Sequence, residues 1–160
     1  MQDIRIKPVT RDHLPLLHDA LTQLSAALGD RHAADLETLE AAGFGPRPVY
    51  RALIATKGDQ PVGALVCSPL FSTTRGGAGL HVSDLWVAQS ARGCGLGRRL
   101  LAHALADAQS TTPARFIRLA VYDDNPAARQ FYHRLGFAAQ PAESNMVLHG
   151  AAFERLKGMT

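Results

Sequence analysis

The sequence has little cysteine and no long hydrophobic run. Of its 160 residues only two are cysteine, Cys67 and Cys94, and their spacing matches no metal or redox motif. Free thiols in a reducing compartment are the simplest interpretation. No apolar stretch approaches membrane-spanning length, and the first residues lack the charged, apolar, then small pattern of an export signal. We therefore predict a cytoplasmic protein with no metal site and no membrane partner.

A concentrated charge of one sign is absent too, as are repeats, linkers and low-complexity segments. The formal net charge is +3, and the basic residues are scattered. This scatter disfavours a nucleic-acid partner and leaves a small anionic ligand open. The length suits one domain with its own core, and an apolar content of 46% is ordinary for a folded chain. We predict a single domain over residues 1–160.

Hydrophobic periodicity predicts one strand, two helices and three strands, followed by helix, strand, helix and strand. Strands are expected over 4–9, 49–56, 61–71, 80–88, 115–121 and 145–150. Helices are expected over 13–28, 32–43, 96–109 and 125–136, with a short helix in the tail. Gly43 and Gly136 are expected to end the second and fourth helices. This order predicts a mixed α/β sheet with helices on its faces.

The most informative stretch is ARGCGLGRRLL (91–101), in which Gly93, Gly95 and Gly97 alternate between Arg92 and Arg98. It joins a predicted strand to a predicted helix. The N–H groups at a helix start lack partners and carry the positive end of the helix dipole. Glycines let the backbone approach a ligand closely. The stretch therefore predicts a phosphate-binding turn.

Other phosphate motifs fit this stretch less well. The P-loop pattern is absent, and the dinucleotide fingerprint needs a glycine where Arg98 stands and an acid about 20 residues later. Asp107 comes too early for that role. A glycine-rich turn without a ligand is the alternative at this point.

Two motifs in order resemble the GNAT (GCN5-related N-acetyltransferase) superfamily. The first is Arg92-x-x-Gly95-x-Gly97, and the second is DNPAARQFYHRLGF (124–137), with Asn125 and Tyr132 at its matching positions. The segments GFGPRPVY and HVSDLWV look most like the diamine branch, the spermidine/spermine-type and thialysine acetyltransferases. The resemblance implies the acyl-CoA N-acyltransferase fold, a mixed, mostly antiparallel α/β sheet with helices on both faces.

The resemblance also implies an enzyme that uses acetyl-CoA as co-substrate and moves its acetyl group directly to an amine. By analogy with close relatives it implies a homodimer. The implied cofactor-binding residues are Leu85, Trp86 and Val87 beside the pantetheine arm, Arg92, Gly93, Cys94, Gly95, Leu96, Gly97 and Arg98 around the pyrophosphate, and Asn125 near the arm.

Tyr132 matches the tyrosine that protonates the departing thiolate in this family. A phenol with a reference pKa near 10 can protonate a thiolate whose pKa is about 8.5 if the site lowers its pKa or if the transfer is concerted. The alternative is a core tyrosine with Leu135 and Ala128 as neighbours.

The general base is less defined. Regular alternation divides strand 80–88 into two faces. One face would carry His81, Ser83, Leu85 and Val87, and the other Val82, Asp84 and Trp86. The diamine branch has Glu-Asp where this chain has Ser83-Asp84. His81 is one candidate base. A water chain ending on Asp84 is the rival, and Asp84 is also a candidate substrate ligand.

The acceptor is predicted only as a class. The diamine branch has a Tyr-Glu pair late in its first helix, where this chain has Ala-Ala-Leu (26–28). Polyamines are therefore disfavoured, and we predict a small primary amine such as a diamine, an amino acid or an analogue. A peptide amine and a non-catalytic acetyl-CoA-binding sensor stay open. The acceptor site is expected from loops 29–47, 72–79 and 138–144.

Overall fold

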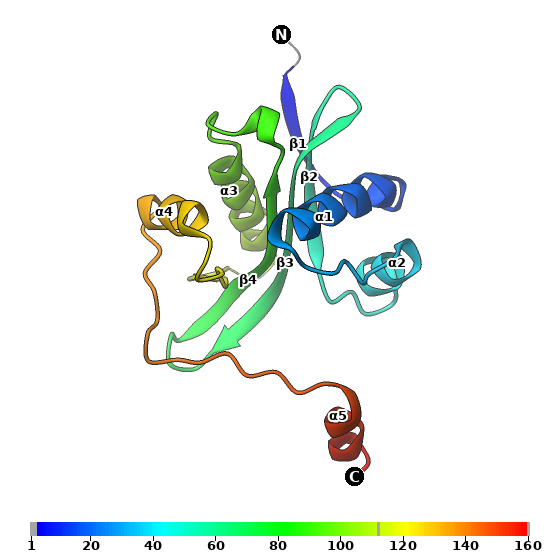
Figure 1. Ribbon diagram of the computed structural model, residues 1–160, viewed down its shortest axis with the longest axis vertical. Helices are drawn as coiled ribbons and strands as arrows, with labels where there is room; N and C mark the ends of the chain where they lie inside the picture. Colours follow the sequence, from blue (N-terminus) through cyan, green and yellow to red (C-terminus); the bar gives the residue numbers. More distant parts are fainter. Residues whose placement is uncertain (1–2, 112, 160) are drawn as a thin grey trace. The chain divides into compact units, whose positions relative to one another are not determined.

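The computed structural model describes residues 3–111 and 113–159, and Figure 1 shows the course of the chain. The chain divides into two compact units, Met1–Ala120 and Val121–Thr160. The first unit holds the β-sheet and the longer helices. The predicted single domain stays a prediction.

The sheet of the first unit has the strand order β1-β2-β3-β4-β5. The strands span Ile4–Pro8 (β1), Arg51–Lys57 (β2), Gln60–Ser72 (β3), Gly77–Val87 (β4) and Ile117–Arg118 (β5). Neighbours from β1 to β4 are antiparallel, and β5 is parallel to β4. This confirms the prediction of a mixed, mostly antiparallel sheet.

One face of the sheet carries two helices, α1 (Leu14–Leu28) and α2 (Leu36–Phe44) (Figure 1). The buried leucines of α1 recur at three- and four-residue steps, which gives the helix one apolar side. Among them, Leu17 and Leu21 join a buried cluster with Val66 and Trp86 of the sheet. We call this side of the sheet the α1 face.

The opposite face carries α3 (Leu96–Gln109), whose bounds match the predicted helix. Leu96 and Leu100 of α3 are buried against the sheet. A Cβ at Gly63 of β3 would lie 3.1 Å from the side chains of both leucines, so glycine lets helix and sheet approach closely. The prediction of helices on both faces is confirmed.

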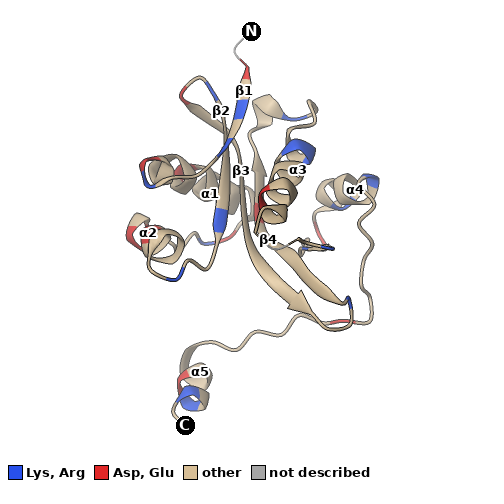
Figure 2. Cartoon of the chain, turned by 180° about the vertical axis from the view of Figure 1, so that it is seen from behind, with Lys and Arg blue, Asp and Glu red and all other residues tan. Residues whose placement is uncertain are grey.

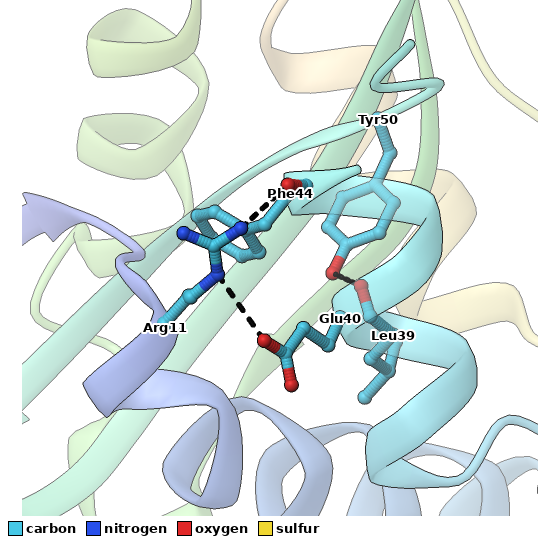
Figure 3. Close-up of polar contacts among 5 residues, drawn as sticks. All are labelled: Arg11, Leu39, Glu40, Phe44 and Tyr50. Atoms are coloured by element: carbon cyan, nitrogen blue, oxygen red, sulfur yellow. Dashed lines mark hydrogen bonds and ion pairs between the residues drawn. The ribbon is translucent and has the colours of Figure 1, made fainter. Parts of the chain in front are cut away.

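Polar contacts hold α2 in place (Figure 3). Arg11 donates from Nη2 to the Phe44 carbonyl (2.8 Å) and pairs through Nε with Glu40 Oε1 (3.2 Å). The Tyr50 hydroxyl donates to the Leu39 carbonyl (2.7 Å), and burial raises the pKa of Tyr50. These contacts tie α2 to segments that precede α1 and β2.

The predicted end of the second helix at Gly43 is wrong, because α2 continues to Phe44. A Cβ at Gly43 would lie 2.6 Å from the Tyr50 ring, so the glycine makes room for that ring. The helix begins at an Asp35 cap, whose Oδ1 accepts from the Thr38 N–H (2.8 Å). This hydrogen bond lowers the pKa of Asp35.

The second unit contains α4 (Pro126–Arg134) and α5 (Gly150–Lys157). Asn125 caps α4 through Oδ1, which accepts from the Ala128 N–H (3.1 Å). Gly136 has a φ of +93°, the left-handed conformation in which glycine commonly follows a helix. The predicted cap and stop of this helix are confirmed.

Two strand predictions are wrong. Residues 145–150 form no strand, and Met146 and Val147 are 93% and 83% exposed. The strand expected over 115–121 shrinks to Ile117–Arg118, which pairs only with Leu80 and His81. A strand forms only where its backbone finds a hydrogen-bonding partner, and apolar sequence alone does not provide one.

Lys and Arg residues are spread over β1, α3, α4 and α5 rather than gathered on one element (Figure 2). Within residues 3–111 and 113–159, no helix is long and apolar enough to cross a membrane. Across the same residues, no group of three or more His, Cys, Asp or Glu side chains could hold a metal ion.

Candidate active site

The predicted phosphate-binding stretch forms a tight turn at the start of α3. Gly93 and Gly95 have φ values of +78° and +76°, which side chains other than glycine rarely adopt. No side chain caps α3, whereas α2 and α4 are capped by Asp35 and Asn125. The first N–H groups of α3 are therefore open to an anion, because helical hydrogen bonds begin only with Arg99 N–H to the Gly95 carbonyl (3.0 Å).

The side chains of this turn contribute less than its backbone. Arg92 donates from Nε to the Val87 carbonyl (3.1 Å), so it fixes the turn to the end of β4 as well as adding charge. The Cys94 thiol donates to the Ala91 carbonyl (3.0 Å). Leu96 is buried in the core, whereas Arg98 is exposed. The cofactor contact predicted for Leu96 can thus come only from its backbone, whereas Cys94 is exposed.

Strands β4 and β5 separate directly after the pair His81–Arg118. From Val82 to Val87 the outer edge of β4 pairs with no strand of the described residues. This stretch contains Leu85, Trp86 and Val87, the residues predicted to lie along the pantetheine arm. The Trp86 side chain is 5% exposed and packs in the α1-face core, so only its backbone faces this edge.

A β-bulge in β4 corrects the predicted division into faces. Val66 pairs with Asp84, but the next residue, Cys67, pairs with Val82, so Ser83 is an extra residue. Such an insertion re-aims the side chains on one side of it. Residues directly opposite each other share a face, so Asp84 lies with Val66 on the α1 face.

The same register places His81 on the α1 face. His81 pairs with Ser68, which is two residues from Val66 on β3. The α1 face thus carries His81, Asp84 and Trp86, whereas Val82, Leu85 and Val87 lie on the other. The two candidate base residues are brought to one side of the sheet, and both are half-buried.

Tyr132 lies on α4 in the second unit between two aromatic rings. Its ring centroid is 5.0 Å from that of Phe131 and 5.4 Å from that of Phe137. Burial raises the pKa of Tyr132 to about 12. The idea that its surroundings lower this pKa is therefore wrong. A free thiolate with a pKa of about 8.5 is a weaker base than this phenolate, so of the two expected conditions only a concerted proton transfer is compatible with the raised pKa.

The structure also brings together two histidines that belong to none of the predicted motifs. His18 and His32 stack edge to face with ring centroids 5.0 Å apart. The Nε2 atom of His32 is buried without a hydrogen-bond partner. These residues are 14 positions apart, one on a helix and one on a loop, so no short sequence motif predicts that they are in contact.

The chain belongs to the acetyltransferase (GNAT) family, whose sequence profile matches residues 16–137, more than half of the chain. This confirms the resemblance and supports an acetyltransferase enzyme. A thialysine N-epsilon-acetyltransferase of Bos taurus is 31% identical over 116 residues, which are 68% of this chain and 68% of that protein.

Two further relatives are matched over less of their length. The peptidyl-lysine N-acetyltransferase YjaB of Escherichia coli is 31% identical over 110 residues, 69% of this chain and 63% of that protein. The N-alpha-acetyltransferase 40 of Saccharomyces cerevisiae is 38% identical over 68 residues, 39% of this chain and 24% of that protein. The chain thus covers less than two thirds of either relative.

Solved structures agree on the fold. An integron cassette protein from the Vibrio cholerae mobile metagenome superposes with a TM-score of 0.77, covering 98% of both chains at 23% identity. An aminoglycoside N-acetyltransferase, AAC(6')-Iy, solved in complex with CoA, has a TM-score of 0.73 at 15% identity and covers 93% of this chain and 95% of its own. The predicted fold class is confirmed.

Proposed function

We propose that the protein transfers the acetyl group of acetyl-CoA directly to a primary amine of a small molecule, such as a diamine, an amino acid or an analogue. The uncapped glycine turn at the start of α3 carries this proposal. Its open N–H groups suit the pyrophosphate of coenzyme A. The unpaired edge of β4, which leads into that turn, suits the pantetheine arm.

The reaction needs a neutral amine, N–H donors for the oxyanion and a proton for the thiolate. Acetyl-CoA supplies the activated acetyl group. In our proposal, backbone N–H groups of Leu85–Val87 stabilise the oxyanion, and Tyr132 gives its proton to sulfur as the C–S bond breaks. Asn125 lies near the cofactor arm in the family, and here its side chain also fixes the start of α4.

The side chains on the α1 face favour an acceptor that carries a positive charge. The Asp84 carboxylate attracts an ammonium group, and His81 on the same face is the second candidate for the proton acceptor. The thialysine acetyltransferase relative favours an amine on a short chain. The acceptor segment expected over 72–79 is smaller than predicted, because β4 begins at Gly77.

A peptide lysine or N-terminus is the second candidate acceptor, favoured by the E. coli and yeast relatives. A third candidate function, an acetyl-CoA sensor with little catalysis, is favoured by Ser83, which stands where the diamine branch has a glutamate and leaves the base undefined. These candidates differ in what they acetylate, so one assay separates them.

The test is thiol release from acetyl-CoA with a panel of amines. The panel holds polyamines, short diamines, thialysine and other amino acids, aminoglycosides and a lysine peptide. We expect turnover with small amines and little with polyamines. Turnover with the peptide alone would favour the second candidate. Tight acetyl-CoA binding with no turnover on any amine would favour the sensor.

We also propose a cytoplasmic homodimer. In the second unit, apolar side chains are exposed at Met146, Val147, Leu148, Phe153 and Leu156. Exposed apolar side chains in this number favour an interaction surface, and a second copy of the chain is the partner we propose. Two free cysteines suit a reducing compartment. A monomer mass by sedimentation at micromolar concentration would refute the dimer.

A further inference from the structure

Ser83 and Asp84 are neighbours in the chain whose side chains meet. The Ser83 hydroxyl donates to Asp84 Oδ2 at 2.7 Å. Its distance to the Val66 carbonyl is 3.4 Å, so its one proton lies on the shorter contact to the carboxylate. Adjacent side chains of a regular strand point to opposite faces and do not meet. The bulge at Ser83 therefore makes this contact possible.

The position of the bulge is as informative as the contact. The last β4–β5 pair is His81–Arg118, and the extra residue follows two positions later. The Ser83–Asp84 contact thus sits where the outer edge of β4 becomes free. An acyl group held along that edge would lie beside it. Bulges beside active sites commonly re-aim a side chain, and here the re-aimed side chain is a half-buried carboxylate.

We propose that Ser83 is a positioning residue that holds the Asp84 carboxylate to receive the ammonium group of the acceptor and take its proton. This inference rests on the proposed acetyl transfer. A hydrogen bond to an ionised acceptor is short and directional. It fixes a carboxylate that could otherwise rotate toward water, and it does so through the hydroxyl alone.

The proton and electron balance is simple. One N–H proton of the ammonium moves to an Asp84 oxygen, which leaves a neutral amine. The nitrogen lone pair forms the N–C bond to the acetyl carbonyl carbon, and the C–S bond breaks with its electrons on sulfur. Tyr132 protonates the sulfur and regains a proton from solvent. The nitrogen then loses its second proton to water, and Asp84 releases its proton to solvent.

The experiment compares Ser83→Thr with Ser83→Val, which have nearly the same shape and differ in the hydroxyl. Thialysine and 1,3-diaminopropane serve as amine probes. We expect Ser83→Thr to stay within about twofold of the parent and Ser83→Val to lose about tenfold in kcat/KM for the amine. The KM for acetyl-CoA stays unchanged in both. Ser110→Ala, a hydroxyl loss at the C-terminal end of α3, is the control and stays at parent activity.

A double-mutant cycle then asks whether Ser83 acts through Asp84. In the Asp84→Asn background we expect Ser83→Val and Ser83→Thr to have equal activity, because the carboxylate they act on is gone. Additive losses would overturn the proposal. Equal activity of the two Ser83 variants in the parent background would also overturn it.

A stability readout keeps the inference testable if the parent acetylates neither probe. The parent, Ser83→Val, Asp84→Asn and the double variant are unfolded in urea, and the Ser83–Asp84 coupling is read from the midpoints. If Ser83→Val lowers the urea midpoint in the parent but not in the Asp84→Asn background, the result supports the contact. No coupling overturns it. Absent turnover with intact coupling would instead count against the proposed function.

Discussion

His81 and Asp84 lie on the same face of the sheet, although a regular strand would place them on opposite faces. The extra residue Ser83 between them produces this arrangement. The imidazole of His81 and the carboxylate of Asp84 thus share one side of β4, at the point where β5 leaves it.

The first prediction separates these two groups. General-base catalysis contributes about 100-fold or more, so Asp84→Asn should lower kcat/KM for the amine by about that factor. His81→Gln, which keeps a polar side chain, should cost less than about threefold. Steady-state rates at saturating acetyl-CoA measure both. A large loss in His81→Gln with an active Asp84→Asn would make His81 the base.

The second prediction concerns the glycine turn. Gly95 at the start of α3 and Gly29 at the end of α1 both have a φ of +76° with open space around the Cβ position. Alanine should destabilise either site by about 1 kcal/mol, since both adopt the left-handed conformation. Only Gly95→Ala should also weaken acetyl-CoA binding, by about tenfold in calorimetry. Equal affinities of the two variants for acetyl-CoA would show that the turn does not bind the cofactor.

The third prediction tests Tyr132 as the acid. Tyr132→Phe removes one hydroxyl and keeps the ring between Phe131 and Phe137. We expect kcat to fall about 100-fold, while the dissociation constant for CoA changes by less than about twofold. Stopped-flow thiol detection and calorimetry give the two values. Parent-like turnover would exclude the phenol as the proton donor.

The fourth prediction follows from the raised pKa of Tyr132, which burial brings to about 12. Between its unfolded value of about 10 and this value, only the folded state keeps the phenol proton. Stability is therefore fully present below about pH 10 and falls as pH rises toward 12, by about 1 to 2 kcal/mol. Urea unfolding across this range measures the slope. Tyr132→Phe should reduce this slope, and an unchanged slope would contradict the prediction.

The sequence by itself determined the features that depend on neighbours along the chain. The bounds of α3, the Asn125 cap and the left-handed Gly136 follow from local helix and turn chemistry. The glycine turn follows from the same chemistry. The order of strands and helices gave the fold class, because hydrophobic period distinguishes the two.

Only the tertiary structure decided the features that depend on distant partners. The bulge at Ser83 exists in the register between β3 and β4, and no local pattern marks it. Gly43 does not end its helix. A glycine stands there because a Cβ would collide with the Tyr50 ring. The segment 145–150 is apolar but pairs with no described strand. Burial raised the pKa of Tyr132, and the sequence could not decide this because desolvation depends on everything packed around the ring and not on the motif that contains it.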